Sequence, residues 1–345
     1  MHHVEIAGTG SFLPRQLLNN MQMYSKISNF DPDKARVSLQ KKNIDTAKLS
    51  DEEVFNEWVM QVSGIESRHF ISAEDNFTPY YEVEEMACRA ADSAINEAGI
   101  DKNQVESIIF TTFSSKTLIP NPSCTLAHLL GIGKAGGITL NTACSGFIDG
   151  FMDAYAKIAS GIYNTILVAS SEYISKELSF SDPTTSILFG DGAAAVVLKK
   201  SDKPGILSLH SRAEYSSEHI LLRAGEKIQM GGGPLVQRNA VNAMFDSAME
   251  VCNKIKMQFT DFDFIIPHQA NMRIIKELGK KMKVQYEKVV KIIKSVGNTS
   301  CASIPITLDL LRKNKIADCV FTPGSKILCT SVGGGYTFGA AAFTA

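Results

Sequence analysis

Residues 138–158 read ITLNTACSGFIDGFMDAYAKI, and residues 292–312 read IIKSVGNTSCASIPITLDLLR. Each stretch begins with an apolar run of strand length, continues through a turn of small residues and ends in a segment with helical periodicity. The same succession of strand, small-residue turn and helix in two places indicates that one structural unit occurs twice in the chain.

The segments around these two stretches support a duplication. QVESIIFTTFSS precedes the first and DFDFIIPHQANM the second, and each joins a strand-like run to a polar loop. From Ile109 to Cys144 is 144 − 109 = 35 positions, and from Ile266 to Cys301 is 301 − 266 = 35 positions. Two further pairs follow in the same order, TILVASSE with KILCTSVG and GDGAAAVVL with YTFGAAAFTA. We therefore predict two duplicated halves whose equivalent strand ends converge on one cleft.

Short β-rich runs alternate with longer helical stretches, which predicts an α/β protein with largely buried sheets. We expect an N-terminal half over residues 1–203, a C-terminal half over residues 204–345 and a peripheral helical insertion near residues 19–51, which are polar and weakly periodic. The predicted strands are Val4–Ala7, Ser107–Thr112, Gly137–Leu140, Thr165–Ala169, Ala193–Leu198, Phe262–Ile266, Val289–Ile292, Lys326–Thr330 and Thr337–Thr344. The predicted helices are Glu84–Ala98, Ser123–Leu130, Gly146–Ser160, Ala240–Lys256, Met272–Met282 and Ile304–Asn314.

Composition and charge exclude several classes of protein. Of the 345 residues, 44% are hydrophobic and 21% are charged, and the formal net charge is −1. This balance provides no field for nucleic acid or an anionic membrane, and no apolar run reaches the roughly 18 residues of a membrane span. The N-terminus lacks a secretory signal pattern, and the seven cysteines include no CxxC pair. We expect a cytoplasmic protein without a metal site that binds neither nucleic acid nor membrane.

Cys144 is the first candidate for chemistry. It lies in LNTACSGFIDGF, where an apolar strand passes through small residues into a helix. A thiol at a helix N-terminus is close to unpaired backbone N–H groups and to the positive end of the helix dipole, so we expect its pKa to lie below the reference of about 8.5. A buried structural cysteine is the alternative.

His268 and Asn298 follow strands at the corresponding ends of their units. His268 lies in FIIPHQANM and can donate or accept a proton, although a loop histidine with a satisfied hydrogen bond is the common alternative. Asn298 lies in SVGNTSCASIP, where a helix cap is the simpler reading. Together with Cys144 they suggest acyl transfer, in which a thiolate accepts the acyl group and N–H donors stabilise an oxyanion.

Glycine-rich segments can bind ligands through their backbone N–H groups. The triple glycine Gly333–Gly335 joins two strand-like runs and can present backbone N–H groups to an oxyanion, or it can form a tight turn. GTGSFLPR lacks the third glycine of a dinucleotide fingerprint, and GIGKAGG lacks the spacing of a P-loop. No GxSxG or HExxH motif is present, which argues against serine hydrolases and zinc proteases.

The ordered set IAGTGSFLP, GIESRHF, NTACSGF, ILFGDGAAAVVL, IPHQANMRII, GNTSCASIP and SVGGGYTFGAAAF resembles the β-ketoacyl-acyl carrier protein synthase III family of thiolase-fold condensing enzymes. The resemblance covers nearly the whole chain except residues 19–51. It implies a thiolase-like, five-layered α-β-α-β-α fold built from two duplicated halves, and a homodimer.

The resemblance also implies a mechanism. Cys144 would take an acyl group from a thioester of coenzyme A, while His268 and Asn298 would bind the thioester carbonyl of malonyl-acyl carrier protein. Loss of CO₂ would give an enolate that attacks the acyl group, and the backbone N–H groups of Cys144 and Gly334 would hold the oxyanion. The reaction implies no cofactor besides these substrates.

By the same resemblance, binding residues surround this centre. Trp58 corresponds to the tryptophan that packs against the adenine of coenzyme A, whereas Val62 stands where the family has an arginine. Arg273 would receive the phosphopantetheine arm, and Val332 and Ile119 would line the acyl pocket, the latter across the dimer. The cationic residues implied in docking of the carrier protein are Arg273, Lys276, Lys280 and Lys281.

Two alternatives remain open from the sequence. One is a related enzyme of specialised metabolism that uses another acyl acceptor or acts as a plain acyltransferase. The other is a papain-like hydrolase, which also employs Cys, His and Asn. The duplication, the GNTS motif and the lack of a CGSCW-like sequence count against the hydrolase.

Overall fold

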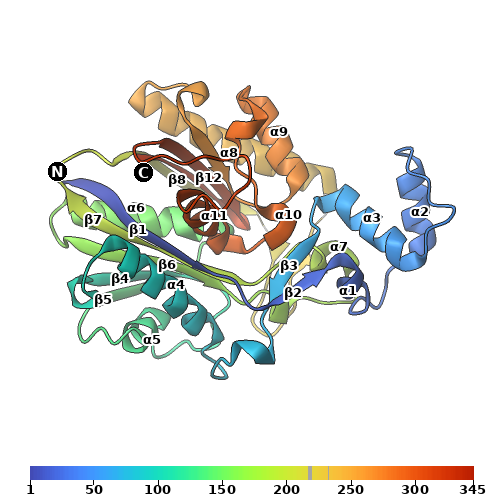
Figure 1. Cartoon of the computed structure of the whole chain (residues 1–345), viewed down its shortest axis with the longest axis horizontal. Coiled ribbons are helices and arrows are strands. Elements are labelled where there is room, and N and C mark those ends of the chain that lie inside the picture. The colour runs from blue at the N-terminus through green and yellow to red at the C-terminus, as the bar shows by residue number, and fades with distance from the viewer. Residues whose placement is uncertain (217–219, 232) are drawn as a thin grey trace.

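The computed structural model describes residues 1–216, 220–231 and 233–345, and it contains two stacked sheets (Figure 1). The strands of the first sheet, in spatial order, are β1 (His3–Phe12), β7 (Gly192–Ser201), β6 (Thr165–Glu172), β4 (Ser107–Thr111) and β5 (Gly136–Leu140). The strands of the second, from the equivalent edge, are β8 (Ile206–Ser216), β13 (Gly335–Thr344), β12 (Lys326–Gly333) and β11 (Phe264–Pro267).

The two sheets repeat one topology. In each, the first three strands pair antiparallel, and the third strand then pairs parallel with the fourth. Strand β4 therefore corresponds to β11, β6 to β12, β7 to β13 and β1 to β8. This shared order confirms the predicted α/β fold with two duplicated halves, and β7 ends just before the connection to β8.

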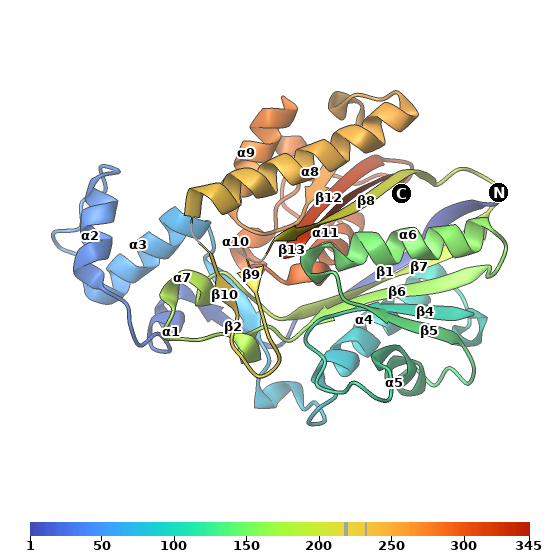
Figure 2. The same ribbon diagram turned by 180° about the vertical axis from the view of Figure 1, so that it is seen from behind.

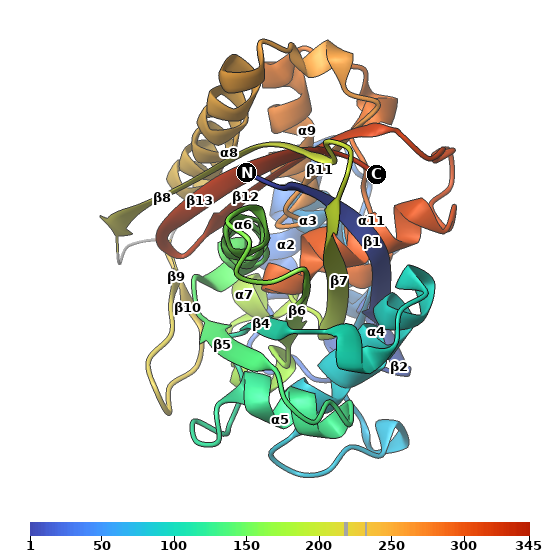
Figure 3. The same cartoon turned by 90° about the vertical axis from the view of Figure 1, so that its left-hand side faces the viewer.

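Helices form three layers around and between the sheets (Figure 3). The central layer consists of α6 (Gly146–Ala159) and α11 (Ser303–Arg312), and each helix contacts strands of both sheets. The outer face of the first sheet carries α4 (Glu82–Ala98) and α5 (Pro122–Leu129). The outer face of the second carries α8 (Gly233–Ile255) and α9 (Met272–Met282), and α8 crosses it obliquely (Figure 2). The order of layers is α-β-α-β-α.

The smaller elements lie toward the end of the molecule where the site is found. The segment expected as a helical insertion holds α1 (Asn20–Tyr24) and α2 (Pro32–Gln40), followed by α3 (Asp51–Ser63), and it projects from one end of the molecule (Figure 1). Other small elements are α7 (Pro183–Ser186) and α10 (Ile293–Val296). Two small antiparallel sheets are formed by β2 (Gln16–Asn19) with β3 (Ser67–Phe70) and by the hairpin of β9 (Ile220–Leu221) with β10 (Gln229–Met230).

The strand predicted at Val289–Ile292 is wrong. Only an isolated bridge joins Val289 to Ile265, and α10 follows immediately. The side chain of Gln269 replaces a neighbouring strand there, because its Oε1 accepts the backbone N–H of Ile292 at 2.9 Å and its Nε2 donates to the carbonyl of Val290 at 3.3 Å. The sequence analysis also missed β8, an edge strand whose last residues are largely exposed.

None of the helices in the described parts of the chain combines the length and apolar character needed to cross a membrane. The sheets instead bury their apolar side chains against the helices. One core cluster includes residues of both sheets and both central helices, among them Val168, Phe151 and Leu308. The two halves therefore share one hydrophobic core.

Helix α4 packs unusually close to β1 because two strand residues lack side chains. A Cβ atom at Gly10 would lie 2.1 Å from the carbonyl oxygen of Ala90, and one at Gly8 would lie 2.3 Å from that of Ala94. The buried alanines of this helix, among them Ala90 and Ala94, lie at the same contact.

We expect Gly10→Ala to lower the free energy of unfolding by about 1–3 kcal/mol, since the added methyl group must push α4 away from β1. Gly133→Ala is the matched control, because no heavy atom of the described residues lies within 4 Å of its new Cβ. Thermal unfolding followed by circular dichroism measures both. Equal midpoints for the two variants would show that the contact is not tight.

Candidate active site

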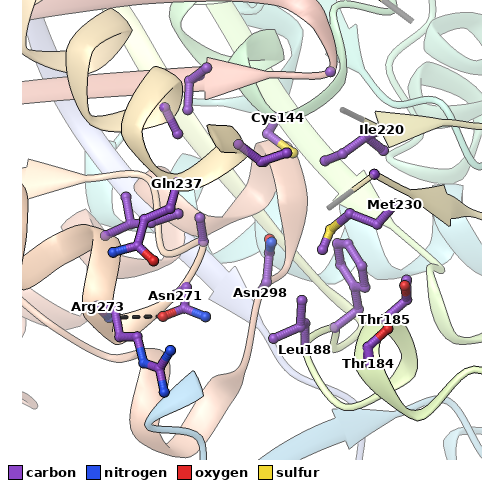
Figure 4. A pocket seen from close by; sticks show the side chains of 18 of the residues that line it. Cys144, Thr184, Thr185, Leu188, Ile220, Met230, Gln237, Asn271, Arg273 and Asn298 are labelled. Atoms are coloured by element: carbon purple, nitrogen blue, oxygen red, sulfur yellow. Dashed lines mark hydrogen bonds between the residues drawn. The ribbon is translucent and has the colours of Figure 1, made fainter. Parts of the chain in front are cut away.

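A cavity of about 500 Å³ lies at the carboxyl ends of the strands, and residues of both halves line it (Figure 4). Cys144 comes from the first half, and His268 and Asn298 come from the second. The structure therefore brings the three predicted side chains to one cavity, as expected if equivalent strand ends converge. All three are buried, with exposed fractions of 8%, 1% and 5% respectively.

A sharp backbone turn positions Cys144. The residue before it, Ala143, has a φ of 48°, and a single 3-10 turn (Ala143–Ser145) leads from it into α6. Ser300 repeats this conformation with a φ of 51° before Cys301, and a 3-10 turn again precedes the helix, α11. Both turns are strained for residues with a Cβ, and the equivalent turns of the two halves face each other.

Close packing allows the two turns to meet. A Cβ atom at Gly146 would lie 3.2 Å from the Cβ atoms of both Cys301 and Thr111. Gly146 is the first residue of α6, so a side chain there would separate the turn of Cys144 from that of Cys301. The glycine of the NTACSG motif thus allows tight packing against Thr111 of the same half and Cys301 of the other half.

The prediction of a lowered thiol pKa is wrong for the resting enzyme. The pKa of Cys144 is raised to about 11, mainly by burial. A hydrogen bond from Ser300 acts to lower the pKa, and the negative charge of Glu172 acts to raise it. The position at the start of a helix is as predicted, but loss of solvation outweighs the helix dipole here. The thiol is therefore the dominant form at neutral pH in the unliganded protein.

His268 is a neutral imidazole. Burial lowers its pKa to about 3, and its Nδ1 lies 2.7 Å from the hydroxyl of Ser303. The Ser303 oxygen accepts the backbone N–H of Gln269 at 3.3 Å, and among the described residues the buried Ser303 hydroxyl has no hydrogen-bond acceptor besides Nδ1 of His268. The ring proton is consequently on Nε2, where it can be donated to a ligand in the cavity.

The carboxamide of Asn298 has one polar atom engaged by the backbone. Its Oδ1 accepts the N–H of Ser300 at 2.9 Å, which assigns the amide orientation and leaves Nδ2 as a donor for the cavity. The backbone N–H of Asn298 donates to the carbonyl of Leu188, and the Asn298 carbonyl accepts the N–H of Gly190. These hydrogen bonds connect the second half to the first. Asn298 and His268 can therefore offer two N–H donors to one carbonyl oxygen.

The glycine-rich segment after β12 closes the cavity beside Cys144. Val332, Gly333 and Gly334 all line it. A Cβ atom at Gly333 would lie 3.0 Å from the backbone nitrogen of Cys144, so only glycine allows the two backbones this close. The predicted oxyanion-binding residue Gly334 thus lies next to the predicted nucleophile.

Trp58 and Arg273 lie at another part of the cavity wall, together with Val62. Trp58 packs against Phe30 of the insertion, with ring centroids 5.4 Å apart. Arg273 donates from Nε to the carbonyl of Gln61 at 3.0 Å, which fixes its guanidinium near the end of α3. The insertion therefore supports the tryptophan side of the cavity.

The other predicted binding residues lie outside the cavity. The exposed residues Lys276 and Lys280 lie on α9, with Lys280 paired to Glu277 at 3.0 Å. Lys281 instead turns toward α8, where its ammonium donates to Asn242 and lies 4.4 Å from the ring centroid of Phe245. Ile119 is 91% exposed and does not line this cavity of its own chain.

Sequence reasoning missed several groups that line the cavity or lie directly behind it. Ser303 orients His268, and Ser300 lies 3.4 Å from the sulfur of Cys144. Glu172 is a fully buried carboxyl at the end of β6. The serines belong to the GNTSCAS segment, but only the folded structure shows which side chains they contact. Ile220 and Met230, from the hairpin β9–β10, also line the cavity.

The two-sheet architecture with a cysteine, a histidine and an asparagine at equivalent strand ends defines a thiolase-fold condensing enzyme. Residues 138–214 match the family model of 3-oxoacyl-[acyl-carrier-protein] synthase III, and residues 252–345 match that of its C-terminal part. The chain is 34% identical to the β-ketoacyl-[acyl-carrier-protein] synthase III of Bordetella petrii, over 98% of this chain and 97% of that protein. It belongs to the β-ketoacyl-[acyl-carrier-protein] synthase III family.

Solved structures agree with this assignment. The 3-oxoacyl-[acyl-carrier-protein] synthase III of Aquifex aeolicus VF5 is 30% identical, with a TM-score of 0.85 over 99% of this chain and 100% of that chain. The priming β-ketosynthase of the R1128 polyketide pathway is 26% identical, with a TM-score of 0.83 over 99% and 96%. The chain is thus an acyltransferase of the condensing type, and the papain-like alternative is wrong.

We expect the imidazole of His268 to stay neutral from pH 5 to pH 8, with its proton on Nε2. Its folded pKa of about 3 lies below the unfolded value of about 6.5, so the stability linked to this group is present above pH 6.5 and lost as the pH falls toward 3. Nitrogen NMR of protein labelled with ¹⁵N-histidine measures both the protonation state and the tautomer of His268. In Ser303→Ala we expect both neutral tautomers to be populated. A titration midpoint for His268 between pH 5 and pH 8 would contradict the assignment.

Proposed function

We propose that this enzyme extends an acyl primer by decarboxylative condensation with malonyl-acyl carrier protein, giving 3-oxoacyl-acyl carrier protein and CO₂. The observation that carries the proposal is the single cavity shared by the Cys144 sulfur, a neutral His268 and the Asn298 carboxamide. These groups match the needs of a covalent acyl-enzyme followed by enolate formation. The reaction takes its place in fatty acid biosynthesis.

In the first half-reaction, Cys144 attacks the carbonyl carbon of an acyl thioester, for which coenzyme A is the proposed carrier. The negative charge moves to the carbonyl oxygen. The backbone N–H groups of Cys144 and Gly334 would receive this oxyanion, since Gly333 holds the two segments together. Collapse of the intermediate expels the donor thiolate and leaves the acyl group on Cys144.

In the second half-reaction, the malonyl thioester carbonyl would accept hydrogen bonds from Nε2 of His268 and Nδ2 of Asn298. Loss of CO₂ places negative charge on that oxygen, and both donors are already oriented, by Ser303 and by the N–H of Ser300. A neutral imidazole favours condensation, because it stabilises the enolate without readily protonating its carbon. The carbon then attacks the acyl-Cys144 carbonyl.

The cavity wall suggests how the substrates are held. Trp58 offers a flat surface for the adenine of coenzyme A, and Arg273 offers a cation for the phosphopantetheine arm. The exposed lysines of α9, Lys276 and Lys280, are suited to an acidic carrier protein, whereas Lys281 is partly engaged by α8. Val332 would contact the acyl chain. The proposal requires no resident cofactor or metal.

The exposed residue Ile119 fits a further part of the proposal, that the enzyme acts as a homodimer in the cytoplasm. Leu118 and Ile119 are 85% and 91% exposed on the loop before α5. Two adjacent apolar side chains with this exposure are suited to contact with a partner subunit. Ile119 would then reach the acyl pocket of that subunit rather than its own.

Release of labelled CO₂ tests the central step. The enzyme is incubated with malonyl-acyl carrier protein labelled in the free carboxyl group and with a panel of acyl donors, and 3-oxoacyl product is weighed by intact-protein mass spectrometry. We expect CO₂ and product together, and Cys144→Ala should show no acyl adduct. An acyl adduct on the Cys144→Ala variant would defeat the assignment of the nucleophile.

A related enzyme of specialised metabolism is the second candidate. The likeness to the R1128 priming β-ketosynthase favours it, as does the tryptophan side of the cavity, where Val62 stands in place of the family's arginine and Phe30 packs on Trp58. Such an enzyme would use a primer on a carrier protein, another acceptor or plain acyl transfer. Acyl transfer to an acceptor without labelled CO₂ would favour this candidate.

We expect His268→Ala to retain self-acylation of Cys144 while decarboxylation of the malonyl thioester falls about a hundredfold or more, because one oxyanion donor is lost. His210→Gln is the control, a buried histidine of β8 that does not line the cavity. Adduct formation and CO₂ release are measured separately. Equal loss of both steps would mean that His268 acts on the thiol instead.

Trp58 is the only tryptophan in the chain, so its fluorescence reports directly on the cavity. We expect coenzyme A to quench it in a saturable manner, because adenine would stack on the indole. Trp58→Phe supplies the blank for absorption by the ligand. If coenzyme A leaves the emission unchanged while an acyl carrier protein alters it, the donor arrives on the carrier protein.

A further inference from the structure

A buried carboxyl group lies behind Cys144 and has no role in the steps described so far. Glu172 is the last residue of β6, and its side chain is fully buried. Its Oε2 accepts the hydroxyl of Ser114 at 2.5 Å, the hydroxyl of Thr112 at 3.1 Å and the N–H of Phe113 at 3.3 Å. These three donors, all from the segment after β4, fix the carboxyl in one orientation.

The second oxygen of Glu172 faces the turn before α11. Its Oε1 lies 3.2 Å from the sulfur of Cys301 and 3.5 Å from the hydroxyl oxygen of Ser300. The same hydroxyl oxygen lies 3.4 Å from the sulfur of Cys144. Ser300 therefore stands between the nucleophile and the carboxyl, and rotation of its O–H bond directs the proton to either side.

The surroundings of Glu172 allow it to exchange a proton near neutral pH. Burial raises its pKa to about 7, against the effect of the donors, which favour the carboxylate. Lys176, in the 3-10 turn after β6, attracts the carboxylate and donates to the carbonyl of Ser114. Among the residues that the structure describes, the other titratable groups that face it are the thiols of Cys144 and Cys301, whose pKa values burial also raises.

We propose that the carboxylate of Glu172, acting through the hydroxyl of Ser300, receives the proton of the Cys144 thiol during acyl transfer and returns it when the thiolate is released. The inference deepens the proposed function and rests on it. Ser300 touches the reacting sulfur and is a catalytic residue in this scheme. Glu172 acts through Ser300 and is a positioning residue.

The proton balance of the first half-reaction is as follows. The S–H bond of Cys144 breaks as the sulfur attacks the thioester carbonyl, its proton passes to the Ser300 oxygen, and the original Ser300 proton passes to Oε1 of Glu172. The bond from the carbonyl carbon to the donor sulfur then breaks. The donor leaves as a thiolate and takes a proton from water, and Glu172 is left neutral.

The second half-reaction reverses the transfer. The enolate carbon forms a bond to the acyl carbon, and the bond from that carbon to the Cys144 sulfur breaks. The emerging thiolate takes the Ser300 proton, and Ser300 takes the proton from Glu172. One proton from solvent is consumed for each CO₂ released, and Glu172 is again a carboxylate.

Alkylation of Cys144 by iodoacetamide as a function of pH tests this relay without any acyl or malonyl substrate. The rate is measured by mass spectrometry of the Cys144 peptide, with the exposed Cys124 as an internal reference. We expect the native rate to rise with a midpoint near pH 7, as Glu172 ionises. In Glu172→Gln this rise should disappear, and the rate at pH 8 should fall at least about tenfold.

The direction of the change separates a relay from a purely electrostatic role. The negative charge of Glu172 raises the pKa of Cys144, so its removal alone would lower that pKa and speed alkylation. Glu84→Gln is the matched control, because Glu84 is also a buried carboxyl with a raised pKa, but its hydrogen bond comes from Ser115. The control should keep the rise near pH 7.

Ser300→Ala provides the second variant in case Glu172→Gln does not fold. It removes the bridge and leaves the carboxyl in place, so it should lose the same rise in rate. Retention of the rise in either folded variant, or faster alkylation of Glu172→Gln, would overturn the relay. Failure of labelled CO₂ release with a normal alkylation profile would instead count against the proposed function alone.

Discussion

Exclusion of water from the carboxyl ends of two stacked sheets is the constraint on which the chemistry depends. Burial raises the pKa of Cys144 to about 11 and that of Glu172 to about 7, and it lowers the pKa of His268 to about 3. In each case the neutral form is favoured, as expected when charge loses its hydration. The resting cavity therefore contains a neutral thiol and a neutral imidazole, whereas Glu172, which lies behind the cavity, can gain or lose a proton near neutral pH.

Hydrogen bonds give these neutral groups their directions. Ser303 assigns the tautomer of His268, and the backbone N–H of Ser300 assigns the amide orientation of Asn298. Both assignments depend on the segment that leads into α11. One short stretch of the second half thus orients the proposed donors His268 and Asn298, and it also places the Ser300 hydroxyl 3.4 Å from the sulfur of Cys144.

Much of the fold could be predicted from the sequence, because the repeated strand, turn and helix leave the same spacing in both halves. The segment Val289–Ile292 could not, since a side chain of the loop, Gln269, takes the place of a neighbouring strand. The turn marks Cys144 as a candidate nucleophile, but the direction expected for its pKa shift is wrong. The local sequence shows that Cys144 lies near the start of a helix, but it does not show how deeply the thiol is buried. It also does not show that Glu172 lies behind Ser300, because that contact forms only in the folded protein.

The central helices have a consequence for how this enzyme loses activity. Because α6 and α11 each pack on both sheets, neither half can open without exposing apolar surface of the other. Local unfolding of either sheet therefore disturbs the contact between the two halves, where the thiol of Cys144 is buried. The rate at which a bulky reagent modifies that thiol consequently reports on cooperative unfolding of the whole protein. Inactivation should accompany loss of structure instead of preceding it.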